Sequence, residues 1–242
     1  MTELPASDGK PTVAVMFIGN IGAGKSTLLT QLGGNFHSDV KFMEGVTQEV
    51  SEQTIILDGK RLILMDTPGL YEIDEEATKA NAEKLTRALD KGYEYKLFFV
   101  LKGTNRGLTS EDLGLMSSVN KCVRLTNDAK VEFGAIINLI PDDKVYNMYK
   151  EKFTMEKLRV LFQSPMLRRY DLDIEFKSVL LVRFDEAAVL NRRLREVIAK
   201  SVKDLAPVKI KLLGTIFARN QDSIVFAVSM IAGVLLAFAA TS

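Results

Sequence analysis

A glycine-rich turn near the amino end carries the strongest chemical signal in the sequence. Its residues satisfy the pattern G-x-x-x-x-G-K-[ST] of a phosphate-binding loop. Glycines let the backbone curl so that consecutive N–H groups point at phosphate oxygens, and the start of the following helix adds partial positive charge. An apolar run precedes the pattern, and leucines at helical spacing follow it. We therefore expect nucleotide phosphates to be bound by Gly19, Asn20, Ile21, Gly22, Ala23, Gly24, Lys25, Ser26 and Thr27.

Oxygen-bearing side chains beside this loop fit a magnesium site. Lys25 can reach the β- and γ-phosphates, while the Ser26 hydroxyl can ligate Mg²⁺. Asp66 ends an apolar run further along the chain, and we interpret it as a Walker-B-type acid that holds Mg²⁺ through water. Thr47 lies between these motifs, where its hydroxyl can complete the Mg²⁺ shell while the γ-phosphate is present. The alternative for Thr47 is that it only begins a strand.

A glycine follows the predicted Walker-B acid in the sequence Asp66-Thr67-Pro68-Gly69. Gly69 can turn its N–H towards a γ-phosphate, because glycine tolerates the change of φ and ψ that such a switch requires. The alternative is an ordinary Pro-Gly turn. The position at a strand end, after a phosphate loop, favours the switch. We therefore assign reaction roles to Lys25, Thr47 and Gly69.

Alternating strands and helices are expected to position these residues. Strands are predicted over 12–18, 47–57, 61–66, 96–101, 131–140 and 178–182, and helices over 25–32, 72–91, 109–119, 144–162 and 186–205. Asp58-Gly59 separates two strand-like runs and predicts a hairpin. This order predicts an α/β fold with a doubly wound, mostly parallel six-stranded sheet and one antiparallel strand. Ligands gather at the carboxyl ends of the strands in such sheets.

Length and composition restrict the other possibilities. The 242 residues suffice for one α/β domain and an appendage. A net charge of +1 gives no electrostatic reason to expect nucleic acid as a partner. Cys122 has no partner for an internal disulfide, which fits a reducing cytosolic setting, and His37 is the only histidine. These counts argue against a zinc site and against Ser-His-Asp catalysis.

The end of the chain differs in character from the rest. Residues 224–240 are apolar and carry no charge. At 1.5 Å per residue they would extend about 26 Å as a helix, close to the roughly 27 Å hydrocarbon core of an endoplasmic-reticulum bilayer. We expect a transmembrane tail anchor here, with a buried core helix as the alternative. The predicted organisation is a flexible N-terminus over 1–11, a cytosolic nucleotide-binding domain over 12–205, a linker over 206–223 and the membrane anchor over 224–240.

Four motifs together resemble those of one family of GTPases. They are the phosphate loop, Val46-Thr47, Asp58-Gly59 and Asp66-Thr67-Pro68-Gly69-Leu70. The chain resembles the avirulence-induced and immunity-associated (GIMAP-type) GTPases of the septin-like TRAFAC P-loop group, over about residues 12–120. This resemblance implies a Ras-like fold, binding of GTP or GDP with Mg²⁺, and homodimers or oligomers formed through the nucleotide face. It also implies a C-terminal membrane anchor, as in several members.

The base-reading motif Asn-Lys-x-Asp of GTPases is altered here. The corresponding stretch runs from Asn138 to Asp143. Asn138 matches the motif, and the resemblance implies that it binds the nucleotide. Leu139 replaces the lysine, and the acid is displaced to Asp142 or Asp143. Preference for guanine is therefore implied by the resemblance and half supported by these residues.

Leu70 stands where many GTPases carry a glutamine that orients the attacking water. An aliphatic side chain has no hydrogen-bonding group for this task, so we expect slow intrinsic hydrolysis unless dimerisation supplies a group in trans. Arg106 is one candidate for that group, with an exposed structural role as the alternative. The sequence thus predicts a membrane-anchored GTP switch. A P-loop ATPase or kinase and a non-hydrolysing nucleotide-binding scaffold remain as alternatives.

Overall fold

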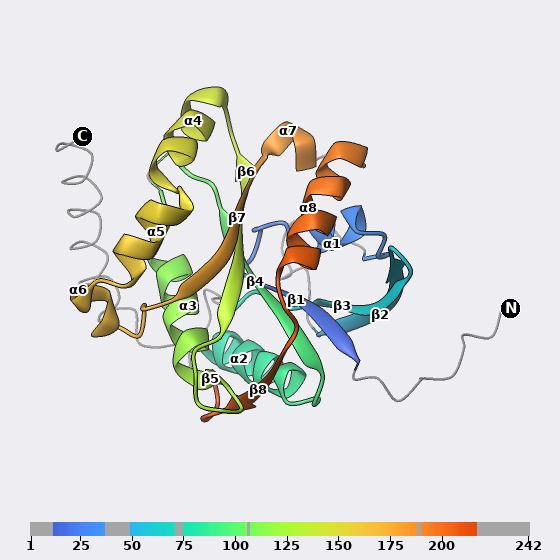
Figure 1. Cartoon of the computed structure of the whole chain (residues 1–242), viewed down its shortest axis with the longest axis vertical. Coiled ribbons are helices and arrows are strands. Elements are labelled where there is room, and N and C mark those ends of the chain that lie inside the picture. The colour runs from blue at the N-terminus through green and yellow to red at the C-terminus, as the bar shows by residue number, and fades with distance from the viewer. Residues whose placement is uncertain (1–11, 37–48, 71–74, 106, 188–189, 217–242) are drawn as a thin grey trace, which may run out of the picture.

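A central β-sheet organises the part of the chain that the structure describes, residues 12–36, 49–70, 75–105, 107–187 and 190–216. In the computed structural model, six strands lie side by side in the order β2-β3-β1-β4-β6-β7 (Figure 1). Only β2 runs antiparallel to its neighbour on this path. The predicted doubly wound, mostly parallel sheet is confirmed, and the six predicted strands form its main path. The strands are β1 Val13–Ile18, β2 Ser51–Leu57, β3 Lys60–Asp66, β4 Glu94–Lys102, β6 Glu132–Ile140 and β7 Glu175–Arg183.

Helices cover both faces of the sheet (Figure 1). On one face, α1 (Lys25–Gln31) and α8 (Arg192–Asp204) bury leucines and an isoleucine against β1 and β4. The other face is covered by α2 (Glu75–Leu89), α3 (Ser110–Cys122), α4 (Asp143–Lys152) and α5 (Met155–Phe162). The short helices α6 (Pro165–Arg168) and α7 (Phe184–Ala187) flank β7 in the sequence. Burial on both faces explains why the parallel strands are continuously apolar.

The β2–β3 connection is the tight hairpin that the sequence predicted. Asp58 and Gly59 have φ angles of 47° and 74°, both in the left-handed region. Two consecutive residues of this conformation make a turn whose twist matches that of the flanking strands, and Asp-Gly is a preferred pair for it. The hairpin pairs Leu57 with Lys60 and Ser51 with Asp66. It therefore sets the register that leaves Asp66 at the end of β3.

Two short strands were not predicted. β8 (Val208–Leu212) pairs antiparallel with β4 and with β5 (Val123–Leu125). Further on, Ile216 is buried and its N–H donates to Thr86 Oγ1 at 3.0 Å. The described residues after 206, which were predicted to form a linker, thus pack on the domain. Their alternation of apolar residues and lysines has the period of a half-buried strand, a signal that the predicted linker did not take into account.

Two predicted helices are interrupted. The helix expected over 144–162 is divided into α4 and α5 at Thr154, whose hydroxyl accepts from the N–H of Lys157 at 3.3 Å. The helix expected over 186–205 is divided into α7 and α8, and Asn191 caps α8 by accepting from two amides. Both residues are preferred N-caps, because their side-chain oxygens satisfy the free N–H groups at a helix start.

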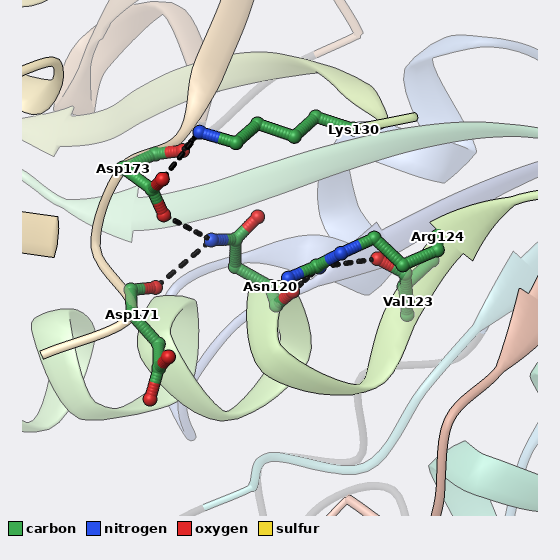
Figure 2. A network of polar contacts seen from close by, with 6 residues as sticks. All are labelled: Asn120, Val123, Arg124, Lys130, Asp171 and Asp173. Atoms are coloured by element: carbon green, nitrogen blue, oxygen red, sulfur yellow. Dashed lines mark hydrogen bonds and ion pairs between the residues drawn. The ribbon is translucent and has the colours of Figure 1, made fainter. Parts of the chain in front are cut away.

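The carboxyl end of α3 is held by a polar network (Figure 2). Asn120 Nδ2 donates to the carbonyl oxygen of Asp171 at 2.9 Å and to Asp173 Oδ1 at 3.3 Å. Lys130 forms an ion pair with Asp173, and Arg124 donates to the carbonyl oxygen of Asn120. These bonds attach α3 to the segment that precedes β7. The amino end of the same helix lies at the predicted phosphate loop.

The predicted membrane localisation requires correction. In the described part of the chain, no helix is both long enough and apolar enough to cross a bilayer. The predicted anchor over 224–240 lies outside the described residues. We therefore withdraw the assignment to a membrane, whereas the helix predicted over 224–240 is not tested by the described residues. Thr47, Arg106 and His37 also lie outside the described residues, so their predicted roles stay predictions.

Candidate functional site

The predicted phosphate-binding loop joins β1 to α1 at the carboxyl end of the sheet. Gly22 and Gly24 have φ angles of 71° and 83°, a conformation that residues with a side chain rarely adopt. Gly24 is the N-cap of α1 and offers no side-chain oxygen to the first amides of the helix. The first turn of α1 contains no acidic residue. The helix start therefore presents backbone N–H groups and positive potential to an anion.

The Lys25 side chain folds back over the loop. Its Nζ atom donates to the carbonyl oxygens of Gly19 at 3.0 Å and of Asn20 at 3.1 Å. The Lys25 side chain is only 7% exposed. A lysine is almost never buried without partners, and these two carbonyl oxygens are partners for its charge. The ammonium group is thus fixed inside the curl of the loop, where the pattern predicts the β- and γ-phosphates.

Ser26 and Asp66 meet, although they are 40 residues apart. The Ser26 hydroxyl donates to Asp66 Oδ2 at 2.6 Å, and both residues are buried. Hydroxyl and carboxylate oxygens are ligands that Mg²⁺ prefers, and the ion takes its remaining ligands from water and phosphates. Among the described residues, no group of three or more His, Cys, Asp or Glu could hold a metal. The donor set therefore fits Mg²⁺ that arrives with a nucleotide.

The predicted switch glycine packs directly against the phosphate loop. A Cβ atom placed on Gly69 would lie 2.4 Å from Ile21 Cγ1 and 2.5 Å from the Ile21 backbone nitrogen, so only glycine fits. The Gly69 carbonyl oxygen accepts from Asn81 Nδ2 at 2.8 Å, which ties the segment to α2. Leu70 is 1% exposed and belongs to the core. Its side chain is therefore unsuited to orient a water molecule, as the sequence predicted.

Asn138 braces the phosphate loop from β6. Its Nδ2 atom donates to the carbonyl oxygen of Ala23 at 2.8 Å, and the residue is completely buried. Its Oδ1 atom has no hydrogen-bond partner among the described residues. The next residue, Leu139, has a φ angle of 59° and lies at an irregularity in the β6–β7 pairing. Asn138 thus contacts the loop, and its predicted contact with the nucleotide stays a prediction.

The two candidate base-reading acids both lie at the start of α4. Asp142 is the N-cap, and its Oδ1 atom accepts from the N–H of Val145 at 2.9 Å. Asp143 forms an ion pair with Arg183, with 2.8 Å between Oδ1 and Nη1. Each acid therefore has a local structural contact, and the geometry of the protein alone selects neither as the reader of a base.

Sequence reasoning missed the contact of Asn20 with Asp112. Asn20 Nδ2 donates to Asp112 Oδ1 at 3.1 Å across 92 residues. Asp112 is 2% exposed. Burial raises the pKa of its carboxyl group to about 6, while hydrogen bonds from Thr109 and Asn20 act in the opposite direction. The helix predicted over 109–119 has Asp112 on its first turn, but no spacing indicated that this turn meets the phosphate loop.

Comparison with known proteins agrees with this geometry. Residues 14–131, just under half of the chain, match the family model described as 50S ribosome-binding GTPase, and this match supports a P-loop GTPase domain in this part of the chain. The tRNA modification GTPase MnmE of Lactobacillus helveticus is 26% identical over 203 residues, covering 81% of this chain and 41% of that protein. The chain thus spans less than half the length of the curated relatives that it matches.

Solved structures show the same fold. Era in complex with MgGDPNP and a segment of 16S ribosomal RNA has a TM-score of 0.54 at 19% identity, covering 81% of this chain and 58% of that chain. A structure of the chloroplast translocon components atToc33 and psToc159 has a TM-score of 0.53 at 14% identity, covering 82% of this chain and 86% of that chain. The fold is therefore the Ras-like α/β fold of P-loop GTPases. The curated relatives named above are MnmE proteins, so the finer resemblance to the immunity-associated GTPases stays a prediction.

Proposed function

We propose that this chain is a guanine-nucleotide switch that binds GTP or GDP with Mg²⁺, hydrolyses GTP slowly and dimerises through its nucleotide face. The contact of Ser26 with Asp66 at 2.6 Å carries the proposal. It brings the last residue of the phosphate-loop pattern to the predicted Walker-B acid. An isolated glycine-rich turn would have no reason to meet a buried carboxylate at the end of a neighbouring strand.

Ser26 and Asp66 would hold the magnesium ion, Asp66 through water, and Thr47 is proposed as a further ligand. When bound, Mg²⁺ supplies positive charge that neutralises the β- and γ-phosphate oxygens. Lys25 supplies a second positive charge from within the loop. Gly69 is proposed to report the γ-phosphate through its backbone N–H, because it already touches the loop at Ile21.

We propose slow GTP hydrolysis because of the residue that follows Gly69. Leu70 lies in the core with 1% of its surface exposed. A hydrocarbon side chain can neither donate nor accept the hydrogen bonds that align an attacking water. Catalysis would then need a group from outside the segment, and Arg106 in a second copy is our candidate.

Dimerisation through the nucleotide face is supported by exposed apolar residues there. Ile21 in the loop is 40% exposed, and Phe184, just after β7, is 59% exposed. Both follow the carboxyl ends of parallel strands, so they lie at the edge of the sheet that carries the loop. In the chloroplast translocon components atToc33 and psToc159, dimerisation is important for the GTPase activity. The resemblance of the four motifs to the avirulence-induced and immunity-associated GTPases points the same way.

Competition binding tests the nucleotide class. Purified protein with Mg²⁺ should bind labelled GTP, and excess unlabelled GTP should displace the label far more effectively than excess ATP. Preferential displacement by ATP would instead identify a P-loop ATPase or kinase. Single-turnover phosphate release over a series of protein concentrations tests the other two parts. A rate that rises with concentration supports activation by dimerisation, whereas no release at any concentration indicates a nucleotide-binding scaffold.

A further inference from the structure

We propose that Asp112 is a positioning residue for the phosphate-binding loop, acting through the side chain of Asn20, and that its charge is coupled to nucleotide binding. This inference rests on the proposed function, since it concerns the same loop. Asp112 Oδ1 accepts from Asn20 Nδ2 at 3.1 Å, and Asn20 is the second residue of the loop pattern. The bond links the amino end of α3 to the residue at which the chain leaves β1.

The carboxylate is held rigidly by its own helix. The N–H of Asp112 donates to Thr109 Oγ1 at 3.2 Å, and the N–H of Thr109 donates to Asp112 Oδ2 at 3.4 Å. These reciprocal bonds form a capping box. One carboxylate oxygen therefore serves the helix start, and the other is directed at the loop. A side chain fixed in this way presents its acceptor to Asn20 in one orientation.

Asn20 transmits this constraint to the loop. Its Oδ1 atom is buried without a hydrogen-bond partner among the described residues, so Asp112 alone sets the orientation of the amide. A turned amide would place its oxygen against the carboxylate, and two acceptors repel. The backbone oxygen of Asn20 accepts from Lys25 Nζ at 3.1 Å. Asn20 thus connects Asp112 to the Lys25 ammonium group through two hydrogen bonds, one at its side chain and one at its backbone oxygen.

The charge of Asp112 is sensitive to its surroundings. Desolvation, with a smaller contribution from the charge of Glu111 on the same helix, raises the pKa of this carboxyl to about 6. On α4, Tyr149 faces it, and burial together with the charge of Asp112 raises the pKa of that hydroxyl. From the loop itself, the facing groups are the neutral Asn20 amide and, beyond it, Lys25. Asp112 is therefore a carboxyl with a pKa of about 6 beside an anion-binding loop.

Nucleotide binding adds negative charge beside this carboxylate. A nearby like charge disfavours the ionised form of an acid. Protonation of Asp112 and binding of the nucleotide therefore favour each other, and the linkage is reciprocal. Binding is expected to take up protons near pH 6–7, and the affinity of the protein is expected to rise as the pH falls from 7.5 to 5.5.

Substitutions separate the hydrogen bond from the charge. Asp112→Asn keeps a carbonyl acceptor for Asn20 and removes the charge, whereas Asp112→Ala leaves the buried Asn20 amide without an acceptor. We expect Asp112→Ala to weaken binding of a fluorescent GDP analogue about tenfold at pH 7.5. We expect Asp112→Asn to bind at least as tightly as wild type. Asp90→Asn, which removes an exposed acid just after α2, is the control and should behave as wild type.

The pH dependence of GDP affinity separates the two roles, because a purely structural role of Asp112 would leave it unchanged. The GDP affinities of wild type and Asp112→Asn are measured at each pH between 5.5 and 8, and their ratio is taken. Phosphate groups of the nucleotide titrate in the same range, but they affect both proteins equally and so do not change this ratio. The ratio should shift several-fold in favour of Asp112→Asn as the pH rises. Calorimetry in two buffers of different ionisation enthalpy should show more proton uptake on GDP binding by wild type than by Asp112→Asn.

Equal affinities of Asp112→Ala and Asp112→Asn would overturn the positioning role, and parallel pH profiles with equal proton uptake would overturn the charge coupling. If Asp112→Ala does not fold, Asn20→Ala breaks the same link without altering the buried acid, and it should also weaken GDP binding about tenfold. Wild type that binds no guanine nucleotide would overturn the proposed function as well. Normal binding with indistinguishable variants would overturn this inference alone.

Discussion

The side-chain amide of Asn138 donates to the carbonyl oxygen of Ala23 at 2.8 Å, joining the end of β6 to the phosphate loop across 115 residues. The residue is completely buried, so this orientation is enforced by its surroundings. A turned amide would bring two oxygens together. Asn138 therefore holds the loop in shape, in addition to any contact with a base.

Replacing Asn138 tests this bracing role. Asn138→Ala removes the donor and should weaken GDP binding about tenfold, and Asn138→Asp should weaken it more, because its carboxylate would face the Ala23 oxygen. Titration with a fluorescent GDP analogue measures both effects. Asn147→Ala, on the exposed side of α4, is the control and should bind normally. If Asn138→Asp bound as tightly as wild type, the amide would not brace the loop.

Gly24 is expected to tolerate no side chain. Its φ angle is 83°, and a Cβ atom would lie 2.4 Å from Asn138 Nδ2. Gly24→Ala should lower the free energy of unfolding by about 2–3 kcal/mol, about 1 kcal/mol from the backbone and the rest from the clash. Gly92→Ala, at a φ angle of 74° with nothing within 4 Å, should lose only the backbone part. Urea unfolding compares the two, and equal losses would show that the Asn138 contact is unimportant.

Ser26 should determine the response to magnesium. Ser26→Asn replaces the hydroxyl that contacts Asp66 with a bulkier amide, so Mg²⁺ should be held poorly and GDP favoured over GTP. Nucleotide affinities measured with Mg²⁺ and with a chelator should differ strongly in wild type and little in the variant. Ser110→Ala, at the start of α3, should keep the wild-type response. A Ser26→Asn protein with an unchanged Mg²⁺ dependence would contradict the proposed metal site.

Local patterns predicted the core of this site, and long-range contacts limited what else could be foreseen. The phosphate loop, the Asp58-Gly59 hairpin and the helix start at Thr109 are each encoded within a few residues, and all three are present. The parallel sheet then brings Asp66 to the loop, because the carboxyl ends of its strands meet at one edge. The pairing of β8 and the contact of Asn20 with Asp112 depend on packing between distant segments, and no local spacing encodes either of them.

The buried carboxyl of Asp112 should also affect how the free energy of unfolding changes with pH. Its folded-state pKa of about 6 lies above the ordinary value of 3.8, so the native state binds more protons between these values. The contribution of Asp112 to stability is therefore fully present below pH 3.8 and is lost as the pH rises through 6. The loss reaches about 3 kcal/mol at neutral pH, as an order of magnitude, from 1.36 kcal/mol per pKa unit.

Urea unfolding at pH 4.5 and 7.5 measures this effect in wild type, Asp112→Asn and Glu111→Gln. The free energy of unfolding of Asp112→Asn relative to wild type should rise with pH, because the variant has no charge to bury. Glu111 provides a control of opposite sign. A hydrogen bond from its own backbone N–H lowers its pKa, so its contribution is present at neutral pH and lost as the pH falls. Glu111→Gln should therefore lose stability relative to wild type by a similar amount at pH 7.5 and pH 4.5, because the contribution of Glu111 is lost only as the pH falls below its ordinary value of 4.5. Parallel profiles for the two variants would show that Asp112 is not the buried titrating group.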